Sequence, residues 1–146
     1  MGGRLAGKAC VITGAGGGMG RDAALLFTEE GAKVCVADVS LDAAEETVGH
    51  CAGEAFAVRA NVAEEEDVRR MCAAAADRFG GIDVLCPNAG VFVGPDRPLE
   101  ETPDDTIDLL IDVNIRGVVN VLRAGLPHVR PGGAVILTSS SRSCRA

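Results

Sequence analysis

The chain has 146 residues, enough for one domain with its own hydrophobic core. Its net charge of -7 argues against nucleic acid or an anionic membrane surface as a main partner. No apolar run approaches the roughly 20 residues of a membrane-spanning helix, and the N-terminus lacks the long apolar core of a signal peptide. We therefore expect one domain, residues 1–146, in the cytoplasm.

Short apolar runs alternate with longer amphipathic segments along the chain. The apolar runs predict strands at Ala9–Thr13, Lys33–Asp38, Ala55–Ala60, Val84–Pro87 and Ala134–Ser139. The amphipathic segments predict helices at about Met19–Glu30, Leu41–His50, Glu64–Phe79 and Asp104–His128. Strands of nearly continuous apolar character are buried on both faces of a parallel sheet. The expected fold class is therefore α/β, a doubly wound parallel sheet with helices on both faces.

A glycine cluster lies between the first strand and the first helix, in the stretch VITGAGGGMGRDAALLF. This junction is where an open α/β sheet binds a nucleotide. Backbone N–H groups at a helix N-terminus can hold a pyrophosphate, and glycines let the phosphates approach the main chain. Gly14, Gly18 and Gly20 have the spacing T-G-x-x-x-G-x-G, which predicts a phosphate-binding turn rather than a flexible linker.

An acidic residue follows at the distance expected of a ribose ligand. Asp38 ends the second predicted strand, 18 residues after Gly20, close to the roughly 20 residues that separate the glycines from the ribose-binding acid in dinucleotide-binding folds. A carboxylate there accepts hydrogen bonds from the ribose hydroxyls and repels a 2′-phosphate. The alternative interpretation of Asp38 is a helix cap or turn residue.

The cysteines and histidines do not form a metal-binding pattern. The six cysteines include no Cys-x-x-Cys pair. Cys10, Cys35 and Cys86 lie in apolar runs, so we interpret them as buried structural thiols. Neither His50 nor His128 has a cysteine or a carboxylate pair at ligand spacing, and we expect no metal site.

Four motifs stand in order along the chain. Thr13–Gly20 forms the glycine motif, and FGGIDVLCPNAG ends in Pro87, Asn88, Ala89 and Gly90. IDVNIRGVVNV carries Asn114, and GGAVILTSSS ends in Ser139 and Ser140. Together these motifs resemble the cofactor-binding N-terminal portion of the short-chain dehydrogenase/reductase family, over essentially the whole chain.

The resemblance implies a Rossmann-type sheet that binds NAD. It also implies which residues contact the cofactor: Gly14, Gly18, Met19, Gly20, Asp38, Asn61, Val62, Asn88, Ala89 and Gly90. The family usually has an Asp-Val pair against the adenine, where this chain has Asn61 and Val62; the asparagine oxygen can still accept from the exocyclic amine. Pro87 stands where the family often has asparagine. Asp38 favours NAD(H) over NADP(H), and Arg21, just past the glycine loop, is the one basic residue that speaks against this preference.

The resemblance also implies chemistry, which is hydride transfer between nicotinamide C4 and a small alcohol or carbonyl substrate. Its catalytic asparagine and serine fall on Asn114 and Ser140, with Ser139 the next candidate. The family's catalytic tyrosine and lysine should follow the serine by about a dozen residues, but this sequence stops six residues after Ser140 and contains no tyrosine. Its lysines are Lys8 and Lys33. We therefore predict a chain truncated before that pair, incomplete at the C-terminal edge of the sheet, and inactive alone.

Two alternatives to the truncated enzyme remain open. The first is a non-catalytic NAD-binding module that associates with a full-length relative, or with itself, through the 104–128 helix. That helix carries an apolar stripe, for which ordinary core packing is the simpler explanation. The second alternative is a non-functional fragment that does not fold stably.

Overall fold

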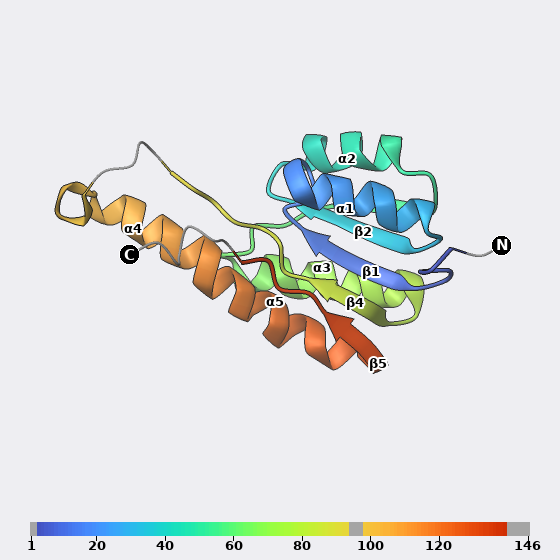
Figure 1. The fold of residues 1–146 in the computed structure, drawn as a ribbon. Coiled ribbons are helices and arrows are strands. Elements are labelled where there is room, and N and C mark those ends of the chain that lie inside the picture. The colour runs from blue at the N-terminus through green and yellow to red at the C-terminus, as the bar shows by residue number, and fades with distance from the viewer. Residues whose placement is uncertain (1–2, 94–97, 140–146) are drawn as a thin grey trace.

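The computed structural model describes residues 3–93 and 98–139. A five-stranded parallel sheet has the order β3-β2-β1-β4-β5, with β1 at its centre. Helices α1 and α2 cover one face of the sheet, and α3 and α5 cover the other (Figure 1). This is the doubly wound α/β arrangement predicted from the sequence. No helix within the described ranges is long and apolar enough to span a membrane.

The boundaries of the elements agree closely with the predicted ones over the first two thirds of the chain. The strands are β1 (Ala9–Thr13), β2 (Lys33–Asp38), β3 (Ala55–Arg59), β4 (Ile82–Cys86) and β5 (Val129–Val135). The helices are α1 (Gly18–Glu29), α2 (Leu41–His50), α3 (Glu65–Phe79), α4 (Asp104–Ile111) and α5 (Gly117–Gly125). Short turns of helix complete the path at η1 (Leu99–Glu101), η2 (Asp112–Arg116) and η3 (Leu126–His128).

Two buried clusters lie on opposite faces of the sheet. Along β1, Val11 faces the α3 side, whereas Cys10 and Ile12 face the α1 side. This alternation is the two-residue period of a strand, and it explains why apolar side chains follow one another without a polar break. The predicted buried thiols are confirmed: Cys10, Cys35 and Cys86 are free and buried, as is Cys72.

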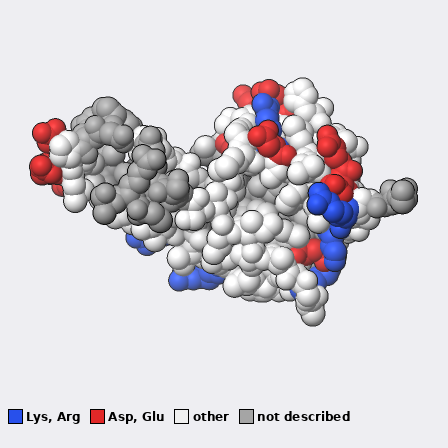
Figure 2. Space-filling model, in the orientation of Figure 1, with Lys and Arg blue, Asp and Glu red and all other residues white. Residues whose placement is uncertain are grey.

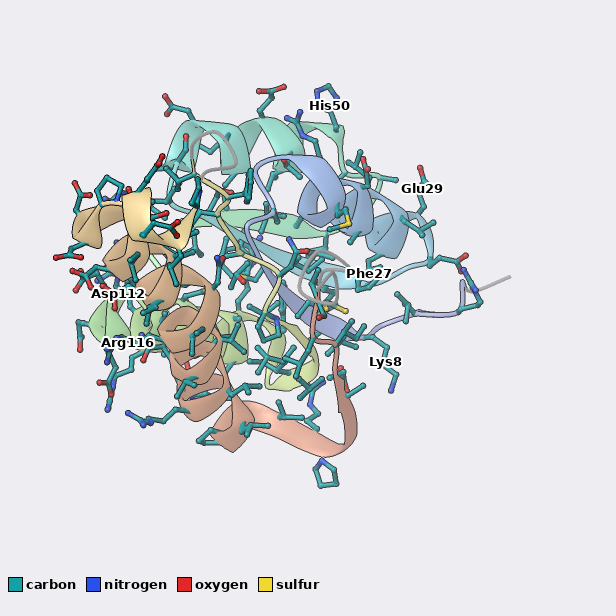
Figure 3. All side chains as sticks on the ribbon, turned by 60° about the vertical axis from the view of Figure 1, so that its left-hand side comes forward. Lys8, Phe27, Glu29, His50, Asp112 and Arg116 are labelled. Atoms are coloured by element: carbon teal, nitrogen blue, oxygen red, sulfur yellow. The ribbon has the colours of Figure 1, made fainter. Side chains whose placement is uncertain are left out.

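The predicted helix 104–128 is one continuous helical rod with a change of pitch in the middle. Between α4 and α5 the backbone winds as a π-helix at η2, where the Gly117 N–H donates to the Asp112 carbonyl five residues earlier. The Arg116 side chain donates to Asp112 across this turn at 2.9 Å (Figure 3). α4 projects from the body of the molecule, and acidic side chains gather near its projecting end (Figures 1 and 2).

The last strand begins earlier than the sequence predicts, at Val129 instead of Ala134. Ile82 pairs with Val129 and Val84 pairs with Ala134, so β5 contains a bulge opposite β4. Pro131 and the glycines after it form this bulge, and Gly132 has a φ of +81°. The Arg130 guanidinium holds the irregular strand in place, because it donates to Asp83 Oδ2 at 2.7 Å and to the Phe79 carbonyl at 2.9 Å.

Candidate functional site

A cleft of about 1350 Å³ opens at the carboxyl ends of the strands. It lies where the chain crosses from one side of β1 to the other, since β2 and β4 flank β1. In open α/β sheets this reversal of strand order leaves a crevice in which ligands bind. The walls of the cleft come from the turn after β1, the ends of β2, β3 and β4, the α4–α5 rod and the segment after β5.

Two glycines around the turn between β1 and α1 leave no room for a Cβ. Gly14 has a φ of +64°, and a Cβ there would lie 2.7 Å from the Ala89 Cα. A Cβ on Gly20 would meet the Gly14 carbonyl and would lie 2.6 Å from Asn88 Nδ2. These glycines therefore let three segments of backbone meet at the floor of the cleft.

The start of α1 faces open space. A Cβ added to Gly17 or Gly18 would meet no atom within 4 Å. The first-turn N–H groups of a helix have no intrahelical acceptor, and the N-cap Gly17 has no side chain with which to cap them. Within the described part of α1, the first turn contains no acidic residue. Free N–H donors and the positive end of a helix dipole suit an anion such as a phosphate.

Asp38, at the end of β2, is held by the glycine turn that it faces. Its Oδ2 accepts from the Gly16 N–H at 2.9 Å, and its Oδ1 accepts from the Ser40 N–H at 3.0 Å. A Cβ on Gly16 would lie 2.8 Å from that Oδ2, so this position also requires glycine. The carboxylate thus lines the cleft in a fixed orientation, with lone pairs left for ligand hydroxyls.

Arg21 is engaged on α2. Its Nε donates to the Thr47 hydroxyl at 3.0 Å, and its Nη2 lies 2.8 Å from Glu46 Oε1. The hydrogen bond from this guanidinium lowers the pKa of Glu46 below its ordinary value, and the charge of Arg21 adds to the effect. The buried Thr47 hydroxyl in turn donates to the Ala15 carbonyl in the glycine turn at 2.9 Å. Arg21 therefore supports the glycine turn through Thr47, while Glu46 neutralises the charge of its guanidinium.

Asn88 joins the glycine turn to β4 and to the segment after β5. Its Nδ2 donates to the Thr13 carbonyl at 3.1 Å, and its Oδ1 accepts from the Thr138 hydroxyl at 3.1 Å. The Thr13 hydroxyl accepts from the N–H groups of both Asn88 and Ala89. These bonds fix the Asn88–Gly90 segment as one wall of the cleft.

Asn61 and Val62 form the wall beyond Asp38, in the loop after β3. The Asn61 side-chain oxygen accepts from the Ala63 N–H at 3.1 Å, so one of its two lone pairs is already used within the loop. The Asn61 N–H donates to Asp67 Oδ2 at 3.0 Å. This hydrogen bond, supported by Arg70, lowers the pKa of Asp67. The loop is therefore rigid before any ligand arrives.

Asn114 lies in the π-helical turn η2, and its amide is paired with the backbone of Val91. Its Oδ1 accepts from the Val91 N–H at 2.8 Å, and its Nδ2 donates to the Val91 carbonyl at 2.9 Å. Single π-helical turns within α-helices are frequent at functional sites. The turn places Asn114 at the cleft and ties the segment after β4 to the helix.

The cleft brings together nearly all of the predicted site residues. Those that line it are Gly14, Met19, Gly20, Asp38, Asn61, Val62, Asn88, Ala89, Gly90 and Asn114. Gly18 opens α1 between two residues that line the cleft, and Ser139 lies on the wall after β5. Ser140 lies outside the described residues. Among the described residues, no group of three histidine, cysteine or acidic side chains is arranged to hold a metal ion.

Several residues that shape the cleft were not singled out in the sequence. Thr13 and Gly16 stand inside the glycine motif, so their position in that motif could have drawn attention to them. Thr47 and Thr138 carry no local signal, because their partners come from distant segments of the chain.

Comparison with known proteins identifies the family. The sequence profile of the short chain dehydrogenase family matches residues 8–145. An uncharacterized oxidoreductase of Listeria monocytogenes is 35% identical over 144 residues, which cover 95% of this chain and 57% of that protein. This chain therefore belongs to the short chain dehydrogenase family of oxidoreductases. It spans about half the length of the curated relatives that it matches.

Solved structures of the same class share the fold. A short chain dehydrogenase from Burkholderia cenocepacia in complex with NADP matches with a TM-score of 0.89 at 32% identity, covering 97% of this chain and 59% of that one. The 3-ketoacyl-(acyl-carrier-protein) reductase of Brucella melitensis complexed with NADH matches with a TM-score of 0.81 at 38% identity, covering 85% and 51%. These two neighbours hold nicotinamide cofactors of both kinds.

Proposed function

We propose that these 146 residues form the NAD(H)-binding part of a short-chain dehydrogenase/reductase that acts on a small alcohol or carbonyl compound. The observation that carries the proposal is the cleft itself, because the glycine turn, Asp38 and the Asn88–Gly90 wall meet around it. The space above Gly17 and Gly18, which a side chain would fill, fits a pyrophosphate. The bound nicotinamide supplies the hydride chemistry.

Each part of the cleft has its own task toward the cofactor. The first-turn N–H groups of α1 bind the phosphates, and Asp38 accepts from the hydroxyls of the adenosine ribose. Gly14, Gly20, Met19 and Gly18 shape the phosphate turn. Asn61 and Val62 face the adenine, and Asn88, Ala89 and Gly90 run beside the remainder of the cofactor. Asn114 and Ser140 serve the substrate end.

NAD(H) is the proposed cofactor rather than NADP(H). The charge of Asp38 at the ribose end of the cleft opposes a 2′-phosphate, and like charges in contact cost several kcal/mol. Arg21, the basic residue that follows the glycine turn, is already paired with Glu46. Because its charge is already neutralised, Arg21 offers little attraction to a 2′-phosphate, which also supports a preference for NAD(H).

Calorimetry with NADH and NADPH tests the cofactor proposal. We expect NADH to bind at least about tenfold more tightly, since each factor of ten needs only about 1.4 kcal/mol. Asp38→Asn keeps an oxygen for the Gly16 N–H while removing the charge, so it should narrow the preference by about tenfold. Asp42→Asn is the matched control, because it removes an exposed charge from the first turn of α2. Tighter NADPH binding by the unaltered chain would contradict the proposal.

Catalysis by these residues alone is not expected. The sequence contains no tyrosine, and its lysines pair elsewhere: Lys33 Nζ lies 3.3 Å from Glu54, and Lys8 Nζ lies 3.9 Å from Asp83. Lys8 and the Asp112–Arg116 turn lie at opposite sides of the molecule (Figure 3). General acid–base assistance is worth about 10²–10⁴ in rate, so the purified chain should not oxidise NADH above a heat-treated control. Steady oxidation that Asn114→Ala abolishes would refute this prediction.

A second candidate function is assembly with another copy of the chain or with a longer relative. The observation that favours it is a row of exposed apolar side chains on the α4–α5 rod, namely Ile111, Ile115, Val119 and Leu126. Such a row is unusual on a monomer surface. Light scattering of the purified chain, with and without a full-length relative, separates this candidate from a monomeric cofactor domain.

A further inference from the structure

Asn120 is a buried amide on α5 that reaches across to the loop after β3. Its Nδ2 donates to the Val62 carbonyl at 2.9 Å and lies 3.4 Å from the Ala63 carbonyl. The residue is only 5% exposed. A buried amide of this kind stabilises a structure only when it is hydrogen-bonded. Here its N–H group donates to the backbone of a cleft wall.

Gly117, one turn earlier on the same rod, receives the side chain of the same loop. A Cβ on Gly117 would lie 2.7 Å from Val62 Cγ2, so the valine is seated directly against the helix backbone. Val62 is buried at this contact. The loop is thus fixed to the rod twice, by a hydrogen bond to its carbonyl and by the packing of its side chain.

The rod therefore holds two walls of the cleft, one from within its π-helical turn and one from α5. Asn114 pairs with the Val91 backbone on one wall, and Asn120 donates to Val62 on the other. Asn120 itself lines a separate, smaller cavity of about 340 Å³ between α3 and α5. It can therefore act on a ligand in the main cleft only through the loop that it holds.

We propose that Asn120 is a positioning residue for the adenine end of the cofactor, an inference that rests on the proposed function above. Because the loop is internally rigid, a shift at Val62 moves Asn61 with it. Loss of the Asn120 donor leaves the Val62 carbonyl buried without its partner, and the loop moves to regain one. The adenine then meets a displaced Asn61 and Val62, whereas the glycine turn at the phosphates stays in place.

The test compares NADH with reduced nicotinamide hypoxanthine dinucleotide, which differs only at the base. Asn120→Leu removes the donor and keeps much of the volume. We expect it to weaken NADH binding about tenfold and to bring the ratio of the two dissociation constants close to one. The matched control is Thr28→Val, another buried polar residue, which lies near the end of α1 remote from the cleft and accepts from the Ala52 N–H. The control should leave the ratio unchanged.

The ratio distinguishes positioning from a general loss of stability. Partial unfolding lowers the apparent affinity for both dinucleotides by the same factor and leaves their ratio intact. An Asn120→Leu protein that binds both ligands as the unaltered chain does, or that weakens both equally, overturns the inference. So does an unaltered chain that binds the two dinucleotides equally well. An unaltered chain that binds neither refutes the proposed function instead.

Gly117→Ala provides a second variant if Asn120→Leu does not fold. Alanine raises helix propensity, while its methyl group pushes Val62 away from the rod. We expect the same fall in the ratio, with no loss of helical content. An unchanged ratio in the folded Gly117→Ala protein would contradict the proposal.

Discussion

Residues 9–86 and residues 98–139 both line the cleft but are built differently. Of the 24 buried hydrophobic side chains that the structure describes, Val121 alone comes after Cys86. The first region packs strands and helices into two buried clusters, whereas the second leaves apolar residues such as Ile115 and Leu137 exposed. The difference teaches that the first region carries the stability of the described fold, while the second contributes walls of the site.

The largest expected effect comes from truncating one isoleucine side chain to alanine in each region. Ile12 in β1 is fully buried, and Ile115 in the π-helical turn is 61% exposed. Ile12→Ala should lower the free energy of unfolding by about 3 kcal/mol, because it removes buried apolar surface and leaves a cavity. Ile115→Ala should change that free energy by about 0.5 kcal/mol or less. Urea unfolding measures both, and equal losses would break the comparison between the regions.

A pair of glycine substitutions sharpens the comparison inside the first region. Gly20→Ala places a methyl group against the Gly14 carbonyl and Asn88 at the floor of the cleft, and it should destabilise the protein by about 2 kcal/mol. Gly49→Ala is the matched control, because a Cβ there meets no atom within 4 Å on α2. It should stabilise the protein by about 0.5 kcal/mol. Two substitutions with the same sign in thermal melts would contradict this account of the turn.

The smallest expected effect is a difference in reactivity among the thiols, which is measured without any substitution. Burial raises the pKa of Cys10 to about 12 and those of Cys72 and Cys86 to about 11, and it also raises that of Cys35. Since the thiolate is the reactive form, these four residues should resist iodoacetamide between pH 7 and about pH 9.

Cys51 provides the internal reference for that experiment. It is half-buried, and its pKa is raised by burial to a lesser extent. Mass spectrometry of the labelled protein should find Cys51 alkylated before the four buried cysteines, which react only after unfolding. Labelling of Cys35 in the folded protein at the rate of Cys51 would show that the first region opens readily.

The sequence predicts the first region better than the second, for a physical reason. β1, β2 and α2 have the predicted bounds, because each is a short periodic run next to its own glycine or cap, such as Ser40, which accepts from the Ala43 N–H. β5 begins earlier than predicted, because the sequence of Pro131 and the two glycines after it is typical of a turn. Only the tertiary contacts of Arg130 with Asp83 and Phe79 show that they form a bulge.

The same distinction holds for the candidate site. The glycine spacing and the position of Asp38 are visible in the sequence, since backbone geometry imposes them locally. The bond from Gly16 to Asp38, the pairing of Asn114 with Val91 and the reach of Asn120 to Val62 are not visible, because each joins segments that only the fold brings together. The sequence therefore predicts which residues meet at the cleft but not how they are held.

The π-helical turn at Asp112–Arg116 limits how the chain can change in length during evolution. This turn holds one residue more than a regular α-helical turn, so deletion of one residue here would restore regular winding and displace Asn114, which lies inside the turn. Asn114 and Asn120 would no longer reach Val91 and Val62 together. Insertions and deletions should accordingly be found in the surface connections of related chains and be absent from this turn.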